Sequence, residues 1–298
     1  MTDAVIRCRG LTKRFGAVVA LDRLDLSVSG GRVVGYLGPN GAGKTTTIRI
    51  VMDLARPTEG DVEVLGADPR RGASGLRRRI GYLPGELRLD ERLTVAATLD
   101  LWSRLRGGVR PAYVRELCDR FDLDVRRRAR DLSSGNRRKV GLVGAFMAKP
   151  DLLVLDEPTS GLDPLVQEEF HRLVEEVRAD GRTVFLSSHV LSEVGRIADE
   201  VIVLRSGRVV AAGTVADLRL AARQPFTAWF AEDAPVDELK AADGVDDLVV
   251  RGREVSGAID GPPGPLLEVL ARNPVEHLLM PEPDLEQAFL RLYEDPAE

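Results

Sequence analysis

Short, mainly apolar runs recur along the chain, and each one ends in glycine or in polar residues. They lie at Val33 to Leu37, Leu152 to Leu155 and Thr183 to His189. Continuous apolar runs of this length predict strands buried on both faces, as in a parallel sheet that helices cover. Because ligands of such sheets bind outside the carboxyl ends of the strands, the residues after each run are candidate site residues. The pattern therefore predicts an α/β domain with its site at one sheet edge.

The first run leads into a glycine-rich segment that fits G-x-x-x-x-G-K-S/T and is followed by a helical pattern. This strand, loop and helix context is the one that a phosphate-binding loop requires, whereas the alternative is a glycine-rich turn with a surface lysine. Glycines let backbone N–H groups approach the phosphates closely. The expected phosphate ligands are Gly38, Pro39, Asn40, Gly41, Ala42, Gly43, Lys44, Thr45 and Thr46. Among them, Lys44 would reach the β and γ phosphates, Thr46 the α phosphate, and the Thr45 hydroxyl would bind Mg²⁺.

Two acidic residues follow the second run directly. Asp156 would hold Mg²⁺, usually through a water, because this ion prefers oxygen ligands and keeps much of its hydration. Glu157 is placed to orient or deprotonate the water that attacks the γ phosphate. His189 ends the third run at the same sheet edge. An isolated acidic pair is more often part of a capped turn and a lone histidine is more often structural, so these roles depend on the adjacent phosphate loop.

The segment Leu132 to Asn136 precedes an apolar and basic run that predicts a helix. The bare N–H groups of a helix start attract anions, although a serine there is commonly an ordinary cap. The segment resembles the LSGGQ signature of ATP-binding cassette (ABC) ATPases, with Ser134 for the first glycine and Asn136 for the glutamine. This resemblance implies that Ser133 and Gly135 contact ATP bound to a second subunit.

Further motifs of the same family occur in the expected order between Val5 and Leu218. Phe15 matches the aromatic A-loop residue on which adenine stacks, and Asp163 lies in the D-loop, which runs along the partner subunit. His189 matches the switch histidine, which senses the γ phosphate. Without the family, Phe15 would be a core residue of a small antiparallel subdomain, and Asp163 would belong to a turn that caps a helix from Pro164.

One position departs from the family pattern, because Gly85 stands where most members carry the Q-loop glutamine. Glycine cannot make the glutamine's contact with Mg²⁺ or water. Either Glu86 reaches in from the next position, or a water replaces the side chain and Gly85 acts as a hinge. The water is favoured, since another carboxylate beside Asp156 and Glu157 would add like charge near the triphosphate.

The sequence predicts two domains. Residues 1–222 are expected to form a P-loop ABC ATPase domain of the α/β class, with a small antiparallel β subdomain and a helical subdomain. Residues 223–298 are expected to form a small α+β domain. Its predicted strands are 226–230, 245–250, 254–259 and 275–280, and its predicted helices are 236–242, 265–272 and 285–293. This βαββαβ order resembles a ferredoxin-like domain, and it carries no chemical motif, so we expect a regulatory or assembly role.

Composition argues against several other classes of protein, namely nucleic-acid-binding, membrane-spanning, secreted and cysteine-rich proteins. The chain has 298 residues and a formal net charge of −5, which argues against broad nucleic-acid binding. No apolar run approaches the roughly twenty residues that cross a bilayer, and the N-terminus lacks the features of a signal peptide. Cys8 and Cys118 have no metal-ligand spacing and form no disulfide framework. We expect a cytoplasmic protein that is held at the inner face of the membrane by its partner.

The resemblance implies the ATP-binding and ATP-hydrolysing subunit of an ABC-2 type transporter. It would energise a separate permease that exports a drug, an antibiotic or a lipid-like compound. Two copies, or this chain and a paralogue, would meet head to tail around ATP and Mg²⁺. The helical pattern from Leu93 to Arg106 either receives the permease's coupling helices or packs on the core. An importer ATPase and a non-transport ABC ATPase are the alternatives, and the second is disfavoured by the single cassette and the absence of heptads.

Overall fold

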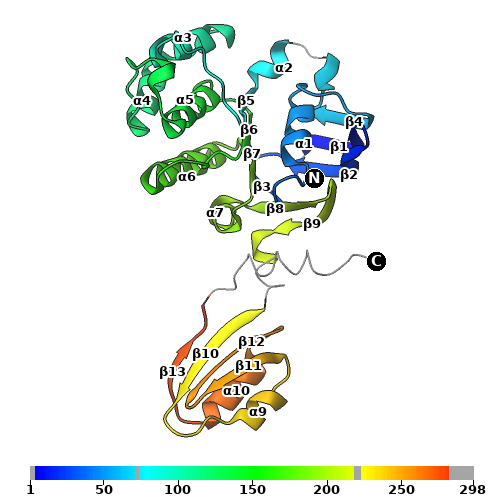
Figure 1. Ribbon diagram of the computed structural model, residues 1–298, viewed down its shortest axis with the longest axis vertical. Coiled ribbons are helices and arrows are strands. Elements are labelled where there is room, and N and C mark those ends of the chain that lie inside the picture. Colours follow the sequence, from blue (N-terminus) through cyan, green and yellow to red (C-terminus); the bar gives the residue numbers. More distant parts are fainter. Residues whose placement is uncertain (1–3, 72–73, 218–222, 282–298) are drawn as a thin grey trace. The chain divides into compact units, whose positions relative to one another are not determined.

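The computed structural model describes residues 4–71, 74–217 and 223–281 of the chain. Two units form within it, Met1–Ala212 and Gly213–Glu298 (Figure 1). The boundary expected from the sequence, between residues 222 and 223, falls beyond this division and just before strand β10 (Gln224–Phe230).

A six-stranded sheet organises the first unit. Its strands, in order across the sheet, are β5 (Ile80–Leu83), β6 (Leu152–Asp156), β7 (Thr183–Ser188), β3 (Val33–Leu37), β8 (Glu200–Arg205) and β9 (Arg208–Thr214). Neighbouring strands from β5 to β8 pair in parallel. Every residue of β3, β6 and β7 is buried, which is why these strands read as continuous apolar runs. The predicted α/β fold is confirmed, and the carboxyl ends of these three strands meet at one edge.

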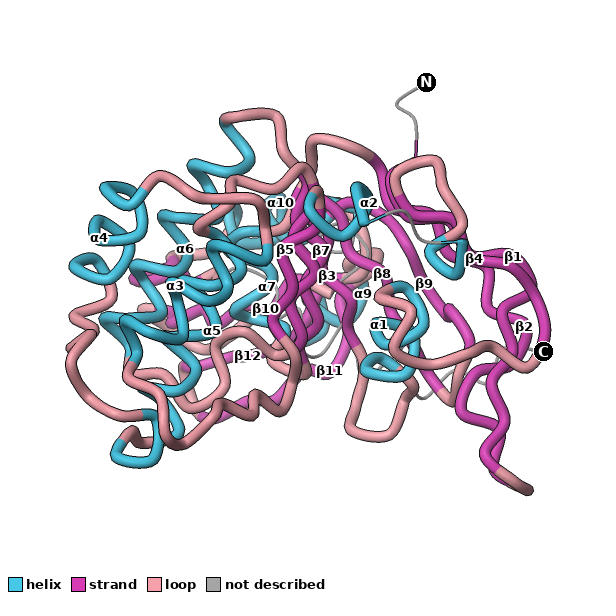
Figure 2. The backbone as a smooth tube through the Cα atoms, turned by 90° about the horizontal axis from the view of Figure 1, so that it is seen from above, coloured by secondary structure: helices cyan, strands magenta, loops and turns pink. Residues whose placement is uncertain are grey.

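Helices cover both faces of this sheet. They are α1 (Lys44–Val51), η1 (Pro69–Arg71), α2 (Ser74–Arg78), α3 (Val95–Leu105), α4 (Pro111–Arg120), η2 (Ala129–Asp131), α5 (Ser134–Phe146), α6 (Pro164–Ala179) and α7 (Leu191–Ile197). Helices α3 to α6 lie on one side of the sheet and α1 lies on the other (Figures 1 and 2). Trp102 of α3 packs so closely on α5 that a Cβ added at Gly144 would lie 2.5 Å from its ring. The α3 helix therefore packs on α5, and this part of the unit is the predicted helical subdomain.

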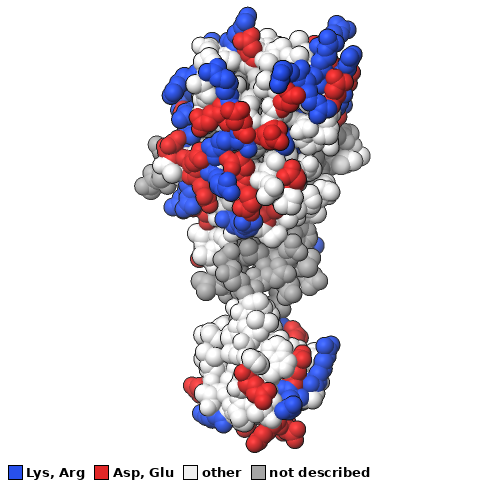
Figure 3. All heavy atoms as spheres, turned by 90° about the vertical axis from the view of Figure 1, so that its left-hand side faces the viewer, with Lys and Arg blue, Asp and Glu red and all other residues white. Residues whose placement is uncertain are grey.

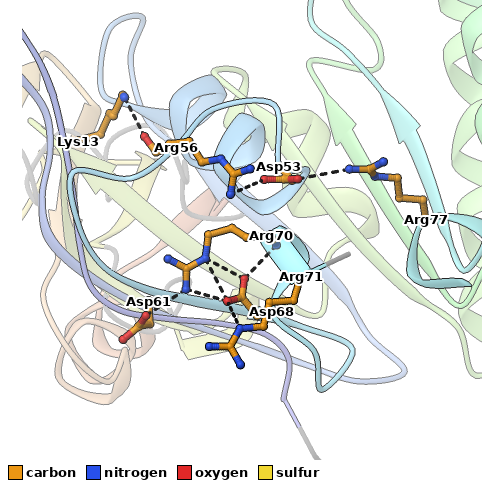
Figure 4. A network of polar contacts seen from close by, with 8 residues as sticks. All are labelled: Lys13, Asp53, Arg56, Asp61, Asp68, Arg70, Arg71 and Arg77. Carbon is orange, nitrogen blue, oxygen red and sulfur yellow. Dashed lines mark hydrogen bonds and ion pairs between the residues drawn. The ribbon is translucent and has the colours of Figure 1, made fainter. Parts of the chain in front are cut away.

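The predicted antiparallel subdomain is the sheet β2-β1-β4, formed by β2 (Val18–Ser29), β1 (Ala4–Phe15) and β4 (Glu59–Val64). Polar contacts tie it to the turn after α1 (Figure 4). Nζ of Lys13 donates to the carbonyl of Arg56 over 2.7 Å, and Asp53 pairs with both Arg56 and Arg77. The same view shows a second cluster, of Asp61, Asp68, Arg70 and Arg71. Surface ion pairs each stabilise by only about 0–1 kcal/mol, so these contacts set orientation more than stability.

The second unit is a four-stranded antiparallel sheet with two helices. Its elements follow β10 in the order α9 (Val236–Ala241), β11 (Val245–Arg251), β12 (Glu254–Ile259), α10 (Gly264–Arg272) and β13 (Val275–Leu279). The strand order β11-β12-β10-β13 is that of a ferredoxin-like sheet, as predicted. Phe226, Phe230 and Leu266 are buried in its core. The last predicted helix, 285–293, lies outside the described residues.

Charges of both signs are interspersed on the face of the first unit that Figure 3 shows. No broad basic area occurs among the described residues on that face. In the described ranges, no helix combines the length and apolar character needed to cross a bilayer.

Candidate functional site

The loop between β3 and α1 lines an open cavity of about 400 Å³ at the carboxyl edge of the central sheet. Residues from six separate segments surround it. They are Ala20, Pro39, Asn40, Gly41, Gly43, Lys44, Thr45, Thr46, Gly85, Arg138, Glu157, Ser160 and His189. The structure therefore brings most of the predicted phosphate ligands together with the predicted catalytic carboxylate and histidine.

Gly43 illustrates why the loop needs glycine. Its φ is +113°, and a Cβ there would lie 2.7 Å from the carbonyl oxygen of Ala20. An L side chain would therefore be strained and would also push the loop away from β2. Helix α1 begins at the next residue, Lys44, so its free N–H groups point at the cavity, an arrangement suited to phosphate.

Lys44 places a positive charge beside the acidic residues of the cavity. Its side chain is only 5% exposed. Nζ donates to the carbonyls of Gly38 and Pro39 over 2.5 and 3.2 Å, and lies 3.5 Å from Oε1 of Glu157. The phosphate loop thus holds the Lys44 ammonium through two carbonyls, and the ammonium faces the Glu157 carboxylate, which follows β6.

Ser187 links the two acidic residues at the end of β6. Its hydroxyl donates to Oδ1 of Asp156 over 2.6 Å and accepts from the backbone N–H of Glu157 over 3.0 Å. Asp156 is fully buried, and among the described residues its other oxygen, Oδ2, has no hydrogen-bond partner. A buried carboxylate oxygen without a partner suits a hard cation that takes its other ligands from water and phosphate.

Glu157 adopts an uncommon backbone conformation, with φ of +51°. Such a residue persists only where its surroundings fix it. Here its N–H group bonds to Ser187, and its carboxylate Oε2 lies 2.8 Å from Nδ1 of His189. The conformation directs the carboxylate between Lys44 and His189.

Gly85 lies directly against Asp156. A Cβ built at Gly85 would be 2.9 Å from Oδ2 of Asp156. The backbone of this loop therefore occupies the space beside the metal-ligand candidate, and the neighbouring Glu86 is exposed and pairs with Arg88. This arrangement does not bring the Glu86 carboxylate into the cavity.

Arg138 is a cavity residue that the sequence did not single out. It lies on α5, is 8% exposed, and donates to the carbonyls of Pro84, Gly85 and Glu157. In the sequence it stands between Arg137 and Lys139, and no pattern separates it from these neighbours. Only the fold reveals that its side chain turns inward.

The signature residues do not line the cavity of Lys44 in the same chain. Helix α5 begins inside the signature, at Ser134, and Ser133 is its N-cap, accepting from the N–H of Asn136 over 3.2 Å. A Cβ added at Gly135 would lie 2.9 Å from the carbonyl oxygen of Gly161. Gly135 is thus also a packing position against the loop that follows β6 in its own subunit.

Two further predicted residues lie outside the cavity lining. Phe15 ends β1 with its ring 55% exposed, and Nζ of Lys13 lies 4.8 Å from the ring centroid. Asp163 is the N-cap of α6, and its carboxylate accepts from the N–H of Val166 over 3.0 Å. The exposed ring excludes the core alternative for Phe15, whereas the capping role of Asp163 is present in the structure.

Comparison with known proteins gives the same family. Residues 21–160 match the family model described as ABC transporter. The chain is 43% identical over 224 residues to the daunorubicin resistance ATP-binding protein DrrA3 of Streptomyces coeruleorubidus, covering 74% of this chain and 71% of that protein. It is 34% identical over 219 residues to the bacitracin transport ATP-binding protein BcrA of Enterococcus faecalis, covering 72% and 71% of the two chains.

Solved structures of ATP-binding cassettes share the fold of the first unit. An ATP-binding subunit of an ABC transporter superposes with a TM-score of 0.67 at 32% identity, covering 72% of this chain and 92% of that chain. A dimeric ATP-binding cassette bound to ADP and Pi shares the fold, with a TM-score of 0.64 at 24% identity, covering 70% and 98%. The chain belongs to the ABC transporter family and is an ATP-binding, ATP-hydrolysing subunit of that family.

Proposed function

We propose that this chain powers export through a separate membrane permease of the ABC-2 type. A drug, an antibiotic or a lipid-like compound is the proposed class of substrate. The similarity to ATP-binding proteins named for daunorubicin resistance and bacitracin transport supports export. The structural observation that carries the ATPase part is the distance of 3.5 Å between Nζ of Lys44 and Oε1 of Glu157 at a cavity that the phosphate loop lines.

The proposed phosphate grip is the loop Gly38 to Thr46. Its N–H groups and the start of α1 bind the β and γ phosphates, and Lys44 adds a full positive charge to them. In this proposal Thr45 and Asp156 hold Mg²⁺, which neutralises part of the triphosphate charge when bound. The free Oδ2 of Asp156 supports this assignment. Phe15, exposed at the end of β1, is proposed to stack on adenine.

Glu157 is the proposed group that orients and deprotonates the attacking water. Oε1 of this carboxylate lies 3.5 Å from Nζ of Lys44, and Nδ1 of His189 lies 2.8 Å from Oε2, within hydrogen-bond distance. His189 is proposed to hold the carboxylate and the water in line with the γ phosphate. The chain's own contribution to hydrolysis is therefore positioning and proton transfer at Oε1 or Oε2 of Glu157.

A second subunit is proposed to complete the site. Ser133 and Gly135 do not line the Lys44 cavity of their own chain, and the N-terminus of α5 offers N–H groups to an anion. A head-to-tail dimer, of two copies or of this chain and a paralogue, would bring this helix start to ATP on the partner, with Asp163 close to the contact. Closure around ATP would drive the permease, which holds the subunit at the inner face of the membrane.

The ATPase part is tested by phosphate release from ATP by the purified chain. We expect turnover in Mg²⁺ and loss of turnover after addition of EDTA; release that is insensitive to EDTA contradicts the proposed metal site. The export part is tested in inside-out vesicles that contain the chain and a permease of about six bilayer-length apolar spans encoded beside it. ATP-dependent daunorubicin uptake, lost when either protein is omitted, supports export. Uptake without this chain contradicts it.

A further inference from the structure

We propose that Arg138 is a positioning residue for ATP hydrolysis, which fixes the Glu157 carboxylate by binding its backbone to the loop at Gly85. The proposal rests on the role of Glu157 given above.

The contacts of Arg138 join three segments at one point. Nη1 donates to the carbonyls of Pro84 and Gly85 over 2.8 and 3.1 Å, and Nη2 donates to the carbonyl of Glu157 over 2.6 Å. A single guanidinium therefore bridges the loop after β5 and the loop after β6. Its planar fork carries donors on separate nitrogens, so Nη1 and Nη2 can reach carbonyls on two different loops, whereas all donors of a lysine ammonium lie on one nitrogen.

Burying the charge of Arg138 costs free energy, which its hydrogen bonds to backbone carbonyls offset. The residue is 8% exposed, and burial lowers the pKa of its guanidinium against the opposing effect of Asp156 and Glu157. Within residues 4–71, 74–217 and 223–281, its side chain forms no ion pair and is satisfied by backbone carbonyls alone. A buried charge of this kind contributes little net stability to the fold. We therefore assign Arg138 a role in fixing the geometry of the residues that it binds.

The geometry in question is that of Glu157. Its N–H group is bound by Ser187, and its carbonyl accepts from Nη2 of Arg138 over 2.6 Å and from the N–H group of Ser160 over 3.2 Å, so the residue is held on both sides at a φ of +51°. Without Arg138 only the longer turn contact from Ser160 would hold this carbonyl, and the peptide after Glu157 could turn toward a commoner conformation. The carboxylate would then leave its place between Lys44 and His189. A displacement of about 1 Å in such a group can cost about a hundredfold in rate.

Gly85 makes the clamp necessary in this chain. It has no side chain to contribute, and its backbone lies so close to Asp156 that a Cβ would be 2.9 Å from Oδ2. Arg138 holds that backbone through the Gly85 carbonyl. Because Arg138 follows Gly135 by one helical turn, the clamp also joins the helix that starts at the signature to the carboxylate of the same subunit.

The test compares Arg138→Met and Arg138→Lys with the wild-type chain in Mg²⁺ and ATP. We expect Arg138→Met to lower kcat by about a hundredfold, with the Kd for ATP unchanged, and Arg138→Lys to give an intermediate kcat. Arg106→Met is the matched control. Nη1 of Arg106 donates to the carbonyl of Ile80 over 2.9 Å at the opposite end of β5, away from the cavity. It should keep kcat.

A double variant separates positioning from general support of the fold. If Arg138 acts through Glu157, then Arg138→Met should have almost no further effect on the residual single-turnover rate of Glu157→Gln. A full and independent loss in both backgrounds, or a kcat for Arg138→Met equal to that of the wild type, overturns the proposal. Failure of the proposed function is distinguishable, because Glu157→Gln would then itself turn over ATP normally.

Discussion

Nδ1 of His189 lies 2.8 Å from Oε2 of Glu157, although the two residues are 32 positions apart in the chain. The contact arises because β6 and β7 are parallel neighbours whose carboxyl ends deliver one residue each to the same edge. Oε1 of the same carboxylate faces Lys44. The carboxylate thus lies between Lys44, which we propose binds phosphate, and His189, which we propose holds the carboxylate in place.

Replacing His189 tests the second of these contacts. We expect His189→Ala to lower kcat for ATP hydrolysis by about ten- to a hundredfold, since one positioned hydrogen bond of this kind is lost, and to leave ATP binding unchanged. His277→Ala is the control, because His277 belongs to the second unit and packs on Trp229. Steady-state phosphate release measures both. Equal rates for the two variants would show that His189 takes no part.

Replacing Lys44 tests the first contact. Lys44→Met should weaken ATP binding by at least about tenfold, because a buried charge-assisted contact with the phosphates is removed. Lys149→Met changes a lysine that lies over the Tyr113 ring and should bind ATP like the wild type. Equilibrium titration with a fluorescent ATP analogue gives both Kd values. Unchanged binding by Lys44→Met would refute the phosphate grip.

Ser133→Gly tests the shared site with little change to the fold. Glycine is a tolerated N-cap that costs only a few tenths of a kcal/mol relative to serine, so α5 should persist while the hydroxyl is lost. Gly135→Asp is less informative, because its Cβ would meet the Gly161 carbonyl at 2.9 Å within one subunit. We expect Ser133→Gly to bind ATP normally and to hydrolyse it more slowly. Weaker ATP binding by the isolated subunit would make the segment a fold element only.

The two thiols should be inert in the folded chain. Burial raises the pKa of Cys8 to about 12 and that of Cys118 to about 11, from an ordinary value of 9.0. Since the folded chain retains these protons more strongly than the unfolded chain, their contribution to stability is full below pH 9 and falls as pH rises toward 11 to 12. Labelling with a disulfide reagent at pH 8 should be slow in buffer and fast in urea. Fast labelling in buffer would contradict this burial.

The sequence predicted those parts of the molecule that depend on local pattern. The strands β3, β6 and β7 are buried on both faces, and such polar residues as they contain stand at their ends. The phosphate loop and the Asp156 and Glu157 pair follow these strands directly, so their gathering at one edge follows from the topology. The order of elements in the second unit was equally readable, from alternating patterns and turn residues.

The sequence could not predict the features of the site that depend on contacts between distant segments. Ser187 bridges Asp156 and Glu157 only because β7 pairs with β6 in a particular register. Arg138 is the same residue type as its neighbour Arg137, and its burial depends on carbonyls from two other loops. The exposure of Phe15 likewise depends on where the β1 strand ends. No local pattern encodes these distances.

The central claim is that Glu157 directs hydrolysis of ATP held between two subunits, and the sedimentation of Glu157→Gln tests it most directly. The variant keeps the volume of the side chain but cannot take a proton, so ATP should stay intact and the two halves should stay closed. With Mg²⁺ and ATP, we expect the Glu157→Gln chain to sediment as a dimer and to release no phosphate, and with ADP we expect a monomer. A Glu157→Gln chain that remains monomeric in ATP, or that releases phosphate at the wild-type rate, would contradict the account.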